Sequence, residues 1–145
     1  MPHPPLFQPG FHQIQLADLG QHFVTPFPQS ATRVVLAQSL ATWVGHVAAT
    51  GVSGQVWLDG SFSTHKTDPQ DVDLVLVFEA SSVQSMAPGQ QTILQALLNQ
   101  QSTRALYSCD VYCVASNDIA MVSYWRGWFG FSRSQVPKGI PFLQL

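Results

Sequence analysis

Two aspartates, Asp71 and Asp73, precede the most apolar run of the chain, and their spacing suits metal chemistry. Side chains alternate along a β-strand, so these carboxylates share one face while Val72 and Leu74 share the other. Carboxylates ~7 Å apart along a strand repel each other and are costly to bury alone. A divalent cation removes both penalties, and Mg²⁺ prefers oxygen ligands. The pattern therefore predicts a pair of metal ligands.

A third acid, Asp110, interrupts another strand-like run, in which Cys109, Val111 and Cys113 share the opposite face. Asp is a poor strand former and is costly to bury, so packing does not explain its presence. If the two strands are neighbours, Asp110 lies ~5 Å across from the pair. Three such carboxylates can hold two Mg²⁺ (or Mn²⁺) ions ~4 Å apart, an arrangement suited to phosphoryl or nucleotidyl transfer.

Gly60 and Ser61 follow a short strand-like run and are candidate phosphate ligands. Glycine lets the backbone approach a phosphate, and the amides that follow it, together with the Ser61 hydroxyl, can bind phosphate oxygens. Lys66, in the next loop, is a candidate phosphate contact, with a solvated surface pair beside Asp68 as the alternative. Asp59 and Asp68 are expected to act as turn or cap residues.

Hydrophobic periodicity predicts helices over 16–23, 30–50, 90–101 and 119–129, and strands over 55–58, 71–78 and 106–115. The run 71–78 is almost wholly apolar after its acids, which is typical of a strand buried on both faces. Residues 1–13 are expected to form an irregular arm. Residues 131–145 are expected to form a tail that Pro137 and Pro141 limit to loop or edge strand. Together these elements predict an α/β (α+β) fold with a small central sheet, in a single domain spanning 1–145.

The composition excludes several classes of protein. The 145 residues are 46% hydrophobic and only 10% charged, with a net charge of −2. This balance argues against disorder and against a protein that holds duplex DNA by charge. We find no signal peptide and no apolar run of ~18 residues, so no membrane partner is expected. Cys109 and Cys113 lie ~13 Å apart on one strand, too far for a disulfide. Two buried, reduced thiols and a cytoplasmic location are therefore expected.

The C-terminal region concentrates basic and aromatic side chains. Arg126, Arg133 and Lys138 are half of the six basic residues. They are candidates for steering a triphosphate or a nucleic-acid end to the acidic site, with ordinary solvated charges as the alternative. Five aromatic residues between 124 and 131 are too dense for one core face. Some are candidates for stacking on a base or for a partner surface, with core packing as the alternative.

These motifs together resemble the signature of the DNA polymerase β-like nucleotidyltransferase superfamily. The segment Leu58-Asp59-Gly60-Ser61 is followed, after nine residues, by Asp71-Val72-Asp73-Leu74, with Asp110 on a later strand. The resemblance implies a nucleotidyltransferase-like fold, a mixed sheet flanked by helices. It also implies Asp71 and Asp73 as metal ligands, Asp110 as third ligand and base for the acceptor hydroxyl, and Gly60-Ser61 as the triphosphate clamp.

Nearly the whole chain is similar to a subfamily of small bacterial, minimal nucleotidyltransferases. The similarity rests on Trp57–Phe62 with Thr64, Lys66 and Pro69, and on Tyr124–Arg126 and Pro137–Ile140. Larger members of the superfamily carry a second domain that holds the acceptor, and this chain is too short for one. Some minimal members act as antitoxins that modify a partner toxin with AMP.

The expected function is Mg²⁺-dependent transfer of a nucleoside monophosphate from a nucleoside triphosphate (NTP) to an acceptor hydroxyl, with release of pyrophosphate. The acceptor is a protein, an RNA end or a small molecule. The alternative is a non-catalytic nucleotide-binding or antitoxin-like partner module that uses the fold without turnover. A third hypothesis is that the protein is a metal-dependent nuclease or phosphatase. The sequence leaves the acceptor, the base and the oligomeric state open.

Overall fold

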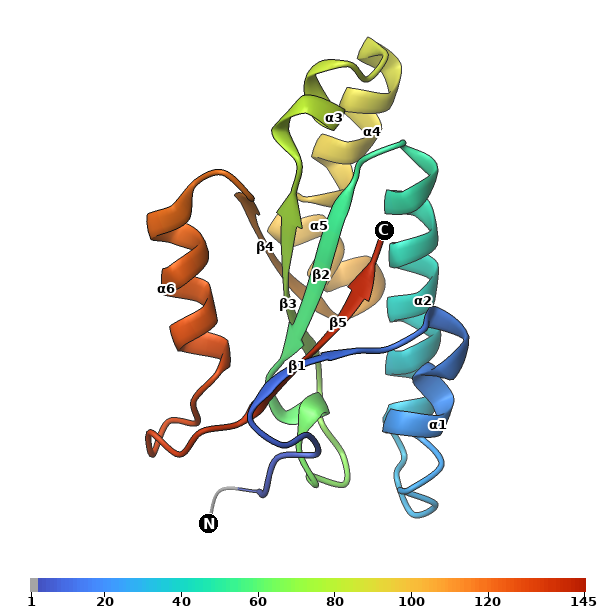
Figure 1. The fold of residues 1–145 in the computed structure, drawn as a ribbon. Helices are drawn as coiled ribbons and strands as arrows, with labels where there is room; N and C mark the ends of the chain where they lie inside the picture. Colours follow the sequence, from blue (N-terminus) through green and yellow to red (C-terminus); the bar gives the residue numbers. More distant parts are fainter. Residues whose placement is uncertain (1–2) are drawn as a thin grey trace.

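The computed structural model describes residues 3–145, and at its centre lies a mixed sheet in the order β1-β5-β2-β3-β4 (Figure 1). Strand β2 is antiparallel to its neighbours β3 and β5, whereas β3 pairs with β4, and β1 with β5, in parallel. The five strands are β1 (Gly10–Gln13), β2 (Gly54–Asp59), β3 (Val72–Phe78), β4 (Cys109–Ala115) and β5 (Gly139–Gln144). The expected α/β (α+β) class with a mixed central sheet is confirmed.

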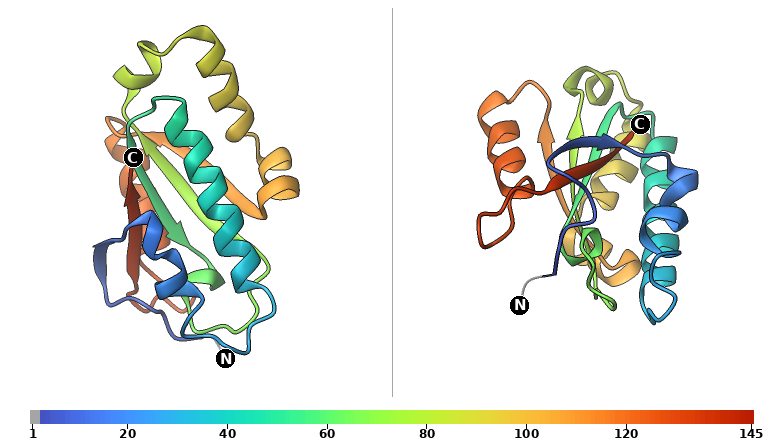
Figure 2. Two further views of the ribbon diagram at one scale, coloured as in Figure 1. Left: turned by 90° about the vertical axis from the view of Figure 1, so that its right-hand side faces the viewer. Right: turned by 60° about the horizontal axis from the view of Figure 1, so that its bottom comes forward.

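Six α-helices flank this sheet, and residues 3–145 include two 3₁₀ turns, η1 (Leu16–Asp18) and η2 (Ser61–Ser63). Helix α6 lies alone on one side of the sheet, and α1, α2, α4 and α5 lie on the other (Figures 1 and 2). No helix in this part of the chain is both long and apolar enough to cross a membrane. The six are α1 (Leu19–Phe23), α2 (Arg33–Ala49), α3 (Ala80–Gln84), α4 (Pro88–Leu97), α5 (Gln100–Tyr107) and α6 (Ile119–Phe129).

Strand β3 is buried on both faces, as its apolar sequence predicts, and it separates two hydrophobic cores. In the larger core, Leu74 and Leu76 pack with the α2 residues Leu40 and Trp43. In the smaller core, the α6 side of β3 packs against Phe129 and neighbouring apolar residues. Because Asp71 and Asp73 belong to the α6 side, one cluster of acids lies at the end of the smaller core.

Both chain ends contain strands whose place in the sheet the local sequence does not predict. Part of the expected irregular arm, 10–13, is β1, and residues 1 and 2 of that arm lie outside the described residues. The expected tail contains β5, which is an interior strand between β1 and β2 rather than a loop or an edge strand. Pro141 is tolerated because the pairing of β5 with β2 ends at Phe142, so no bond to β2 is lost at the proline.

Between β3 and β4 the structure differs from the sequence prediction. The expected helix 90–101 is two helices, α4 and α5, and α3 precedes them. Strand β4 starts at Cys109 rather than at residue 106, because α5 continues to Tyr107 and Ser108 takes a left-handed conformation. Cys109 and Cys113 are free thiols, as expected, but Cys113 is exposed rather than buried, since β4 is an edge strand. Burial raises the pKa of Cys109 to about 12, so this thiol stays protonated.

Candidate metal centre and cleft

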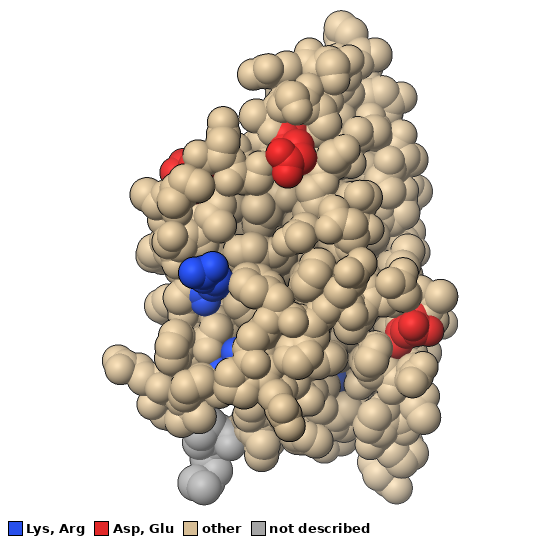
Figure 3. Space-filling model, viewed as in Figure 1, with Lys and Arg blue, Asp and Glu red and all other residues tan. Residues whose placement is uncertain are grey.

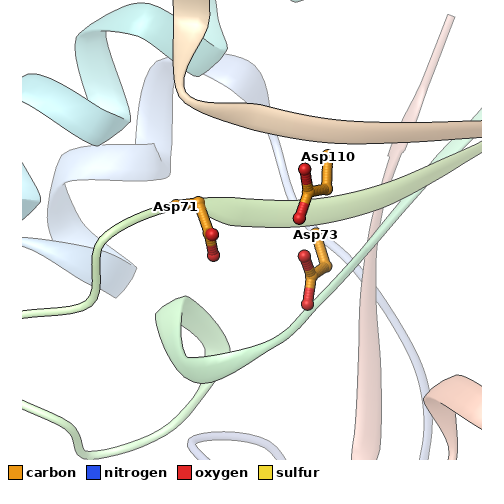
Figure 4. A group of neighbouring side chains, drawn as sticks. All are labelled: Asp71, Asp73 and Asp110. Carbon is orange, nitrogen blue, oxygen red and sulfur yellow. The ribbon is translucent and has the colours of Figure 1, made fainter. Parts of the chain in front are cut away.

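The parallel pairing of β3 with β4 brings the three predicted acids together. Asp73 and Asp110 are register partners, and Asp71 lies two residues before Asp73. Their carboxylates project from the same side of the two strands (Figure 4), and one oxygen of each lies within 4.8 Å of the others. The expected proximity of the three carboxylates is confirmed, while their role as metal ligands stays a prediction.

Gly60 lies directly beside this cluster because Asp59, the residue before it, is the register partner of Asp73 in the β2–β3 ladder. Its φ of +78° lies in the left-handed region that favours glycine. A Cβ atom added at this position would lie 2.6 Å from Oδ2 of Asp73. A side chain at residue 60 would therefore displace the central carboxylate of the cluster. Glycine is favoured here for two reasons, the left-handed φ of the turn and the space that Asp73 occupies.

The cluster holds more negative charge than its surroundings compensate. Burial, together with repulsion from Asp71, Asp110 and Asp59, raises the pKa of Asp73 from 3.8 to about 7. Burial and the neighbouring Asp110 also raise the pKa of Asp71, against the opposing influence of Arg104 and Lys66. Carboxylates held in this way favour a proton or a metal ion between them.

Arg104 is a neighbour of the cluster that sequence reasoning missed. Its Nε donates to Oδ1 of Asp110 at 2.7 Å, and a second guanidinium nitrogen pairs with the same oxygen. The Arg104 side chain is 67% exposed, so it sits at the rim of the cluster rather than among the carboxylates. The only signal in the sequence was its position between the predicted helix 90–101 and the predicted strand 106–115 that carries Asp110.

Asp59 also differs from expectation. It was expected to shape a turn or cap a helix, but it ends β2 as a buried residue and forms an ion pair with Lys138. Burial raises the pKa of Asp59, and Lys138 opposes that shift. The two residues are 79 positions apart in the sequence, so no local pattern could have paired them.

The carboxylates open into a cleft of about 1180 Å³ with two walls of different character. The first wall holds the acids together with Gly60, Ser61, Thr64 and Lys66. The second wall, from the end of α6 and the segment before β5, includes Trp128, Phe131, Ser132, Arg133, Gln135 and Lys138. Thus Arg133 and Lys138 are brought to the site, whereas Arg126 is not among the residues that line it.

Charge in this protein is concentrated at the cleft. The chain has only fourteen Lys, Arg, Asp and Glu residues, and seven of them line the cleft. Elsewhere charges are sparse: the face seen in Figure 1 shows only scattered charged atoms when drawn as a space-filling model (Figure 3). Half of the charged residues of this weakly charged chain therefore line one cleft. Packing of the core does not require such a grouping, because charged side chains are usually dispersed over the surface.

A buried arginine shapes the loop that carries Ser61 and Lys66. Arg33, at the start of α2, is 0% exposed. Its guanidinium donates to the carbonyls of Phe62 and Thr64 at 2.8 and 2.7 Å. It also donates to the carbonyls of Phe23, Ser61 and Lys66. The sequence hid this role, because Arg33 looks like an ordinary polar residue in the first turn of a helix.

A family model described as "Family of unknown function (DUF6932)" matches residues 1–143. The chain belongs to this family. The part matched to DUF6932 includes all three carboxylates and both walls of the cleft. No curated protein and no solved structure matches the chain.

Proposed function

We propose that this DUF6932 protein is a Mg²⁺-dependent nucleotidyltransferase, which moves a nucleoside monophosphate from an NTP to an acceptor hydroxyl. One observation carries the proposal: oxygens of Asp71, Asp73 and Asp110 lie within 4.8 Å of one another in an open cleft. The Gly60-Ser61 turn lines the same cleft. Metal-binding carboxylates next to a glycine turn suit a reaction in which negative charge develops on phosphate oxygens.

The residues present fit a divalent metal. Three carboxylates form an all-oxygen donor set of the kind that Mg²⁺ or Mn²⁺ prefers. The raised pKa of Asp73 reflects burial and mutual repulsion, which a bound cation relieves. Two ions held by Asp71, Asp73 and Asp110 would activate the attacking oxygen and neutralise the charge of the leaving pyrophosphate.

The chain's own groups have separate tasks in this proposal. The Gly60-Ser61 turn and Lys66 bind the triphosphate, since all three residues line the cleft beside the acids. Asp110 accepts the proton of the acceptor hydroxyl. The hydroxyl oxygen forms a bond to the α-phosphorus, the bond from that phosphorus to the β-phosphate oxygen breaks, and pyrophosphate leaves with the electron pair. The acceptor is a protein, an RNA end or a small molecule.

The proposal also includes a cytoplasmic location, because NTPs and Mg²⁺ are abundant there and free thiols such as Cys109 and Cys113 stay reduced.

The test is transfer of label from each α-³²P-labelled NTP, with Mg²⁺ or Mn²⁺, to protein, RNA and small-molecule fractions of a lysate. We expect labelled acceptor and released pyrophosphate with the wild-type chain, and loss of both with Asp71→Ala and Asp73→Ala. Asp18→Ala is the matched control, because Asp18 lies on η1, outside the cleft.

Three outcomes contradict the proposal. Transfer that persists in Asp71→Ala shows that the cluster is not the site. Nucleotide binding without pyrophosphate release, even when every acceptor fraction is supplied, favours the non-catalytic or antitoxin-like module. Metal-dependent hydrolysis that needs no acceptor favours a nuclease or a phosphatase.

A further inference from the structure

We propose that the second wall of the cleft binds the base of the nucleotide, with Trp128 and Phe131 as the stacking surface. This inference deepens the proposed function, since it rests on an NTP as the ligand, but it concerns binding rather than transfer. Both aromatic residues line the same cleft as Asp71, Asp73 and Asp110.

Trp128 and Phe131 are large rings that the fold leaves uncovered. Helix α6 packs on the sheet through Val122, Trp125 and Phe129, which are spaced three and four residues apart on one helix face. Phe129 is 1% exposed, whereas Trp128 is 61% exposed and Phe131 48% exposed. Core packing therefore explains part of the aromatic cluster and not these two side chains. Exposed aromatic rings on the wall of a cleft mark a binding surface.

The segment that carries Phe131 is folded tightly and is tied to the acidic wall. Phe131 forms a β-bridge with Pro137, and the Lys138 amide donates to the Gly130 carbonyl at 2.8 Å. The Lys138 side chain then pairs with Asp59, the last residue of β2. The aromatic wall is thus held at a set position relative to the carboxylates, which lowers the entropy cost of binding a ligand across both walls.

The two walls present different chemical groups to the cleft, which narrows the class of ligand. The first wall presents the carboxylates, and the second wall adds Arg133 to the two exposed rings, while Lys138 is paired with Asp59. A ligand that contacts both walls needs an anionic part that bridges metal-bound carboxylates and basic groups, and a planar apolar part. An NTP has both parts, and its base stacks on aromatic side chains whatever its identity, because every base has a π-face.

Binding experiments can separate the base from the phosphates. The probes are ATP with a methylene group between the α- and β-phosphates, which cannot undergo transfer, and inorganic tripolyphosphate, which has no base. Each is titrated with Mg²⁺ into the full chain by calorimetry. Trp128→Ala and Phe131→Ala are compared with Tyr124→Ala, a change at an aromatic residue of α6 that is 54% exposed and does not line the cleft.

We expect Trp128→Ala to raise the Kd of the ATP analogue roughly tenfold or more, and to leave that of tripolyphosphate unchanged. Phe131→Ala is expected to have a smaller effect in the same direction, and Tyr124→Ala none. Trp128→Phe, which keeps an aromatic face, should restore most of the affinity. This rescue separates stacking from a disturbed fold.

Several results overturn the inference. They are an unchanged Kd for the analogue in both alanine variants, an equal loss of tripolyphosphate binding, and a wild-type chain that binds no nucleotide. If the analogue binds in a Trp128-dependent manner while the wild-type chain transfers no label from any NTP, the base site stands and the proposed function fails. If label transfer depends on Asp71 but binding of the analogue does not depend on Trp128 or Phe131, the proposed function stands and the base site fails.

Discussion

Two charged regions meet at the loop from residue 60 to residue 66, and they are built in opposite ways. On the core side, Arg33 is fully buried, donates to five backbone carbonyls, and lies 3.7 Å from the ring centroid of Phe27. On the cleft side, Asp71 and Asp73 are partly buried, and the nearest like charges are each other and Asp110. The loop therefore separates a positive charge surrounded by acceptors from negative charges that repel one another.

This difference in hydrogen bonding and charge separates a structural group, Arg33, from carboxylates that are suited to binding a ligand. Burial lowers the pKa of Arg33 to about 10, but the guanidinium still stays charged at neutral pH, with its donors satisfied and Asp68 nearby. The carboxylates are compensated less fully: Arg104 pairs with Asp110 from the rim, and the pKa of Asp73 is still raised to about 7. A charge whose hydrogen bonds are satisfied can remain buried in the folded chain, whereas carboxylates that repel one another favour a bound proton or cation. The following changes test this contrast.

The largest loss of stability is expected from Arg33→Met, because it leaves five carbonyls in and around the loop without their donor. A buried acceptor left without its donor costs about 1–3 kcal/mol, so the loss of several should cost at least about 3 kcal/mol. The measurement is the free energy of unfolding in urea. Arg104→Met is the matched control, since Arg104 is exposed and its loss should have a much smaller effect. Equal effects of the two variants would remove the contrast between the regions.

Asp73→Asn should reduce label transfer by at least about 100-fold, because it removes the central carboxylate of the cluster. In metal-free solution the same change should raise the free energy of unfolding by on the order of 1 kcal/mol, since it removes a half-buried carboxylate that its neighbours repel. The folded pKa of Asp73 lies above the unfolded value of 3.8, so the wild-type chain loses stability as pH rises from about 4 to about 7.

The gain from Asp73→Asn should therefore be greatest above pH 7 and should vanish near pH 4. Urea unfolding in EDTA at several pH values measures it. A loss of stability at pH 8 would show that Asp73, like Arg33, is a compensated structural charge.

Mg²⁺ should stabilise the wild-type chain, by about 2.7 kcal/mol when its concentration is 100 times its Kd. The measurement is the shift in melting temperature between Mg²⁺ and EDTA. Asp71→Asn should abolish most of this shift, because it removes one of the three carboxylates. Asp18→Asn, on η1 and away from the cleft, should keep it. A shift that survives Asp71→Asn would place the metal elsewhere.

Gly60→Ala is expected to destabilise the fold by about 1–2 kcal/mol, from the strain of a φ of +78°. The added Cβ would press on Asp73, so the stabilisation by Mg²⁺ should fall as well. Gly45→Ala is the control, since nothing lies within 4 Å of a Cβ at this position in α2 and alanine favours a helix. An unchanged Mg²⁺ response in Gly60→Ala would show that the turn and the cluster are independent.

Much of the candidate site could be predicted, because the types and spacing of nearby residues determine which side chains share a face. The alternation of Asp71, Val72 and Asp73 places both carboxylates on one face of a strand wherever that strand lies. The apolar run after Asp73 predicts a strand buried on both faces, and β3 is such a strand. The order of helices and strands predicts the α/β (α+β) class, which the mixed sheet confirms.

Other features depend on pairings between distant segments, for which a single sequence carries little signal. Asp110 reaches Asp73 only because β4 pairs in parallel with β3 in one particular register, after a crossover through three helices. Lys138 reaches Asp59 only because β5 enters the sheet between β1 and β2. One residue of slippage in either ladder would turn these side chains to the opposite face.

The two charged regions differ in the same way, because one follows from local residue spacing and the other from tertiary packing. The alternating acids and the Gly-Ser turn follow from residue types and spacing, because backbone geometry is local. The surroundings of Arg33 and the exposure of Trp128 follow from which carbonyls and apolar groups are folded around them. Burial and hydrogen-bond partners are properties of the packed molecule, so the tertiary structure alone shows which of these charges and rings are satisfied and which remain open to a ligand.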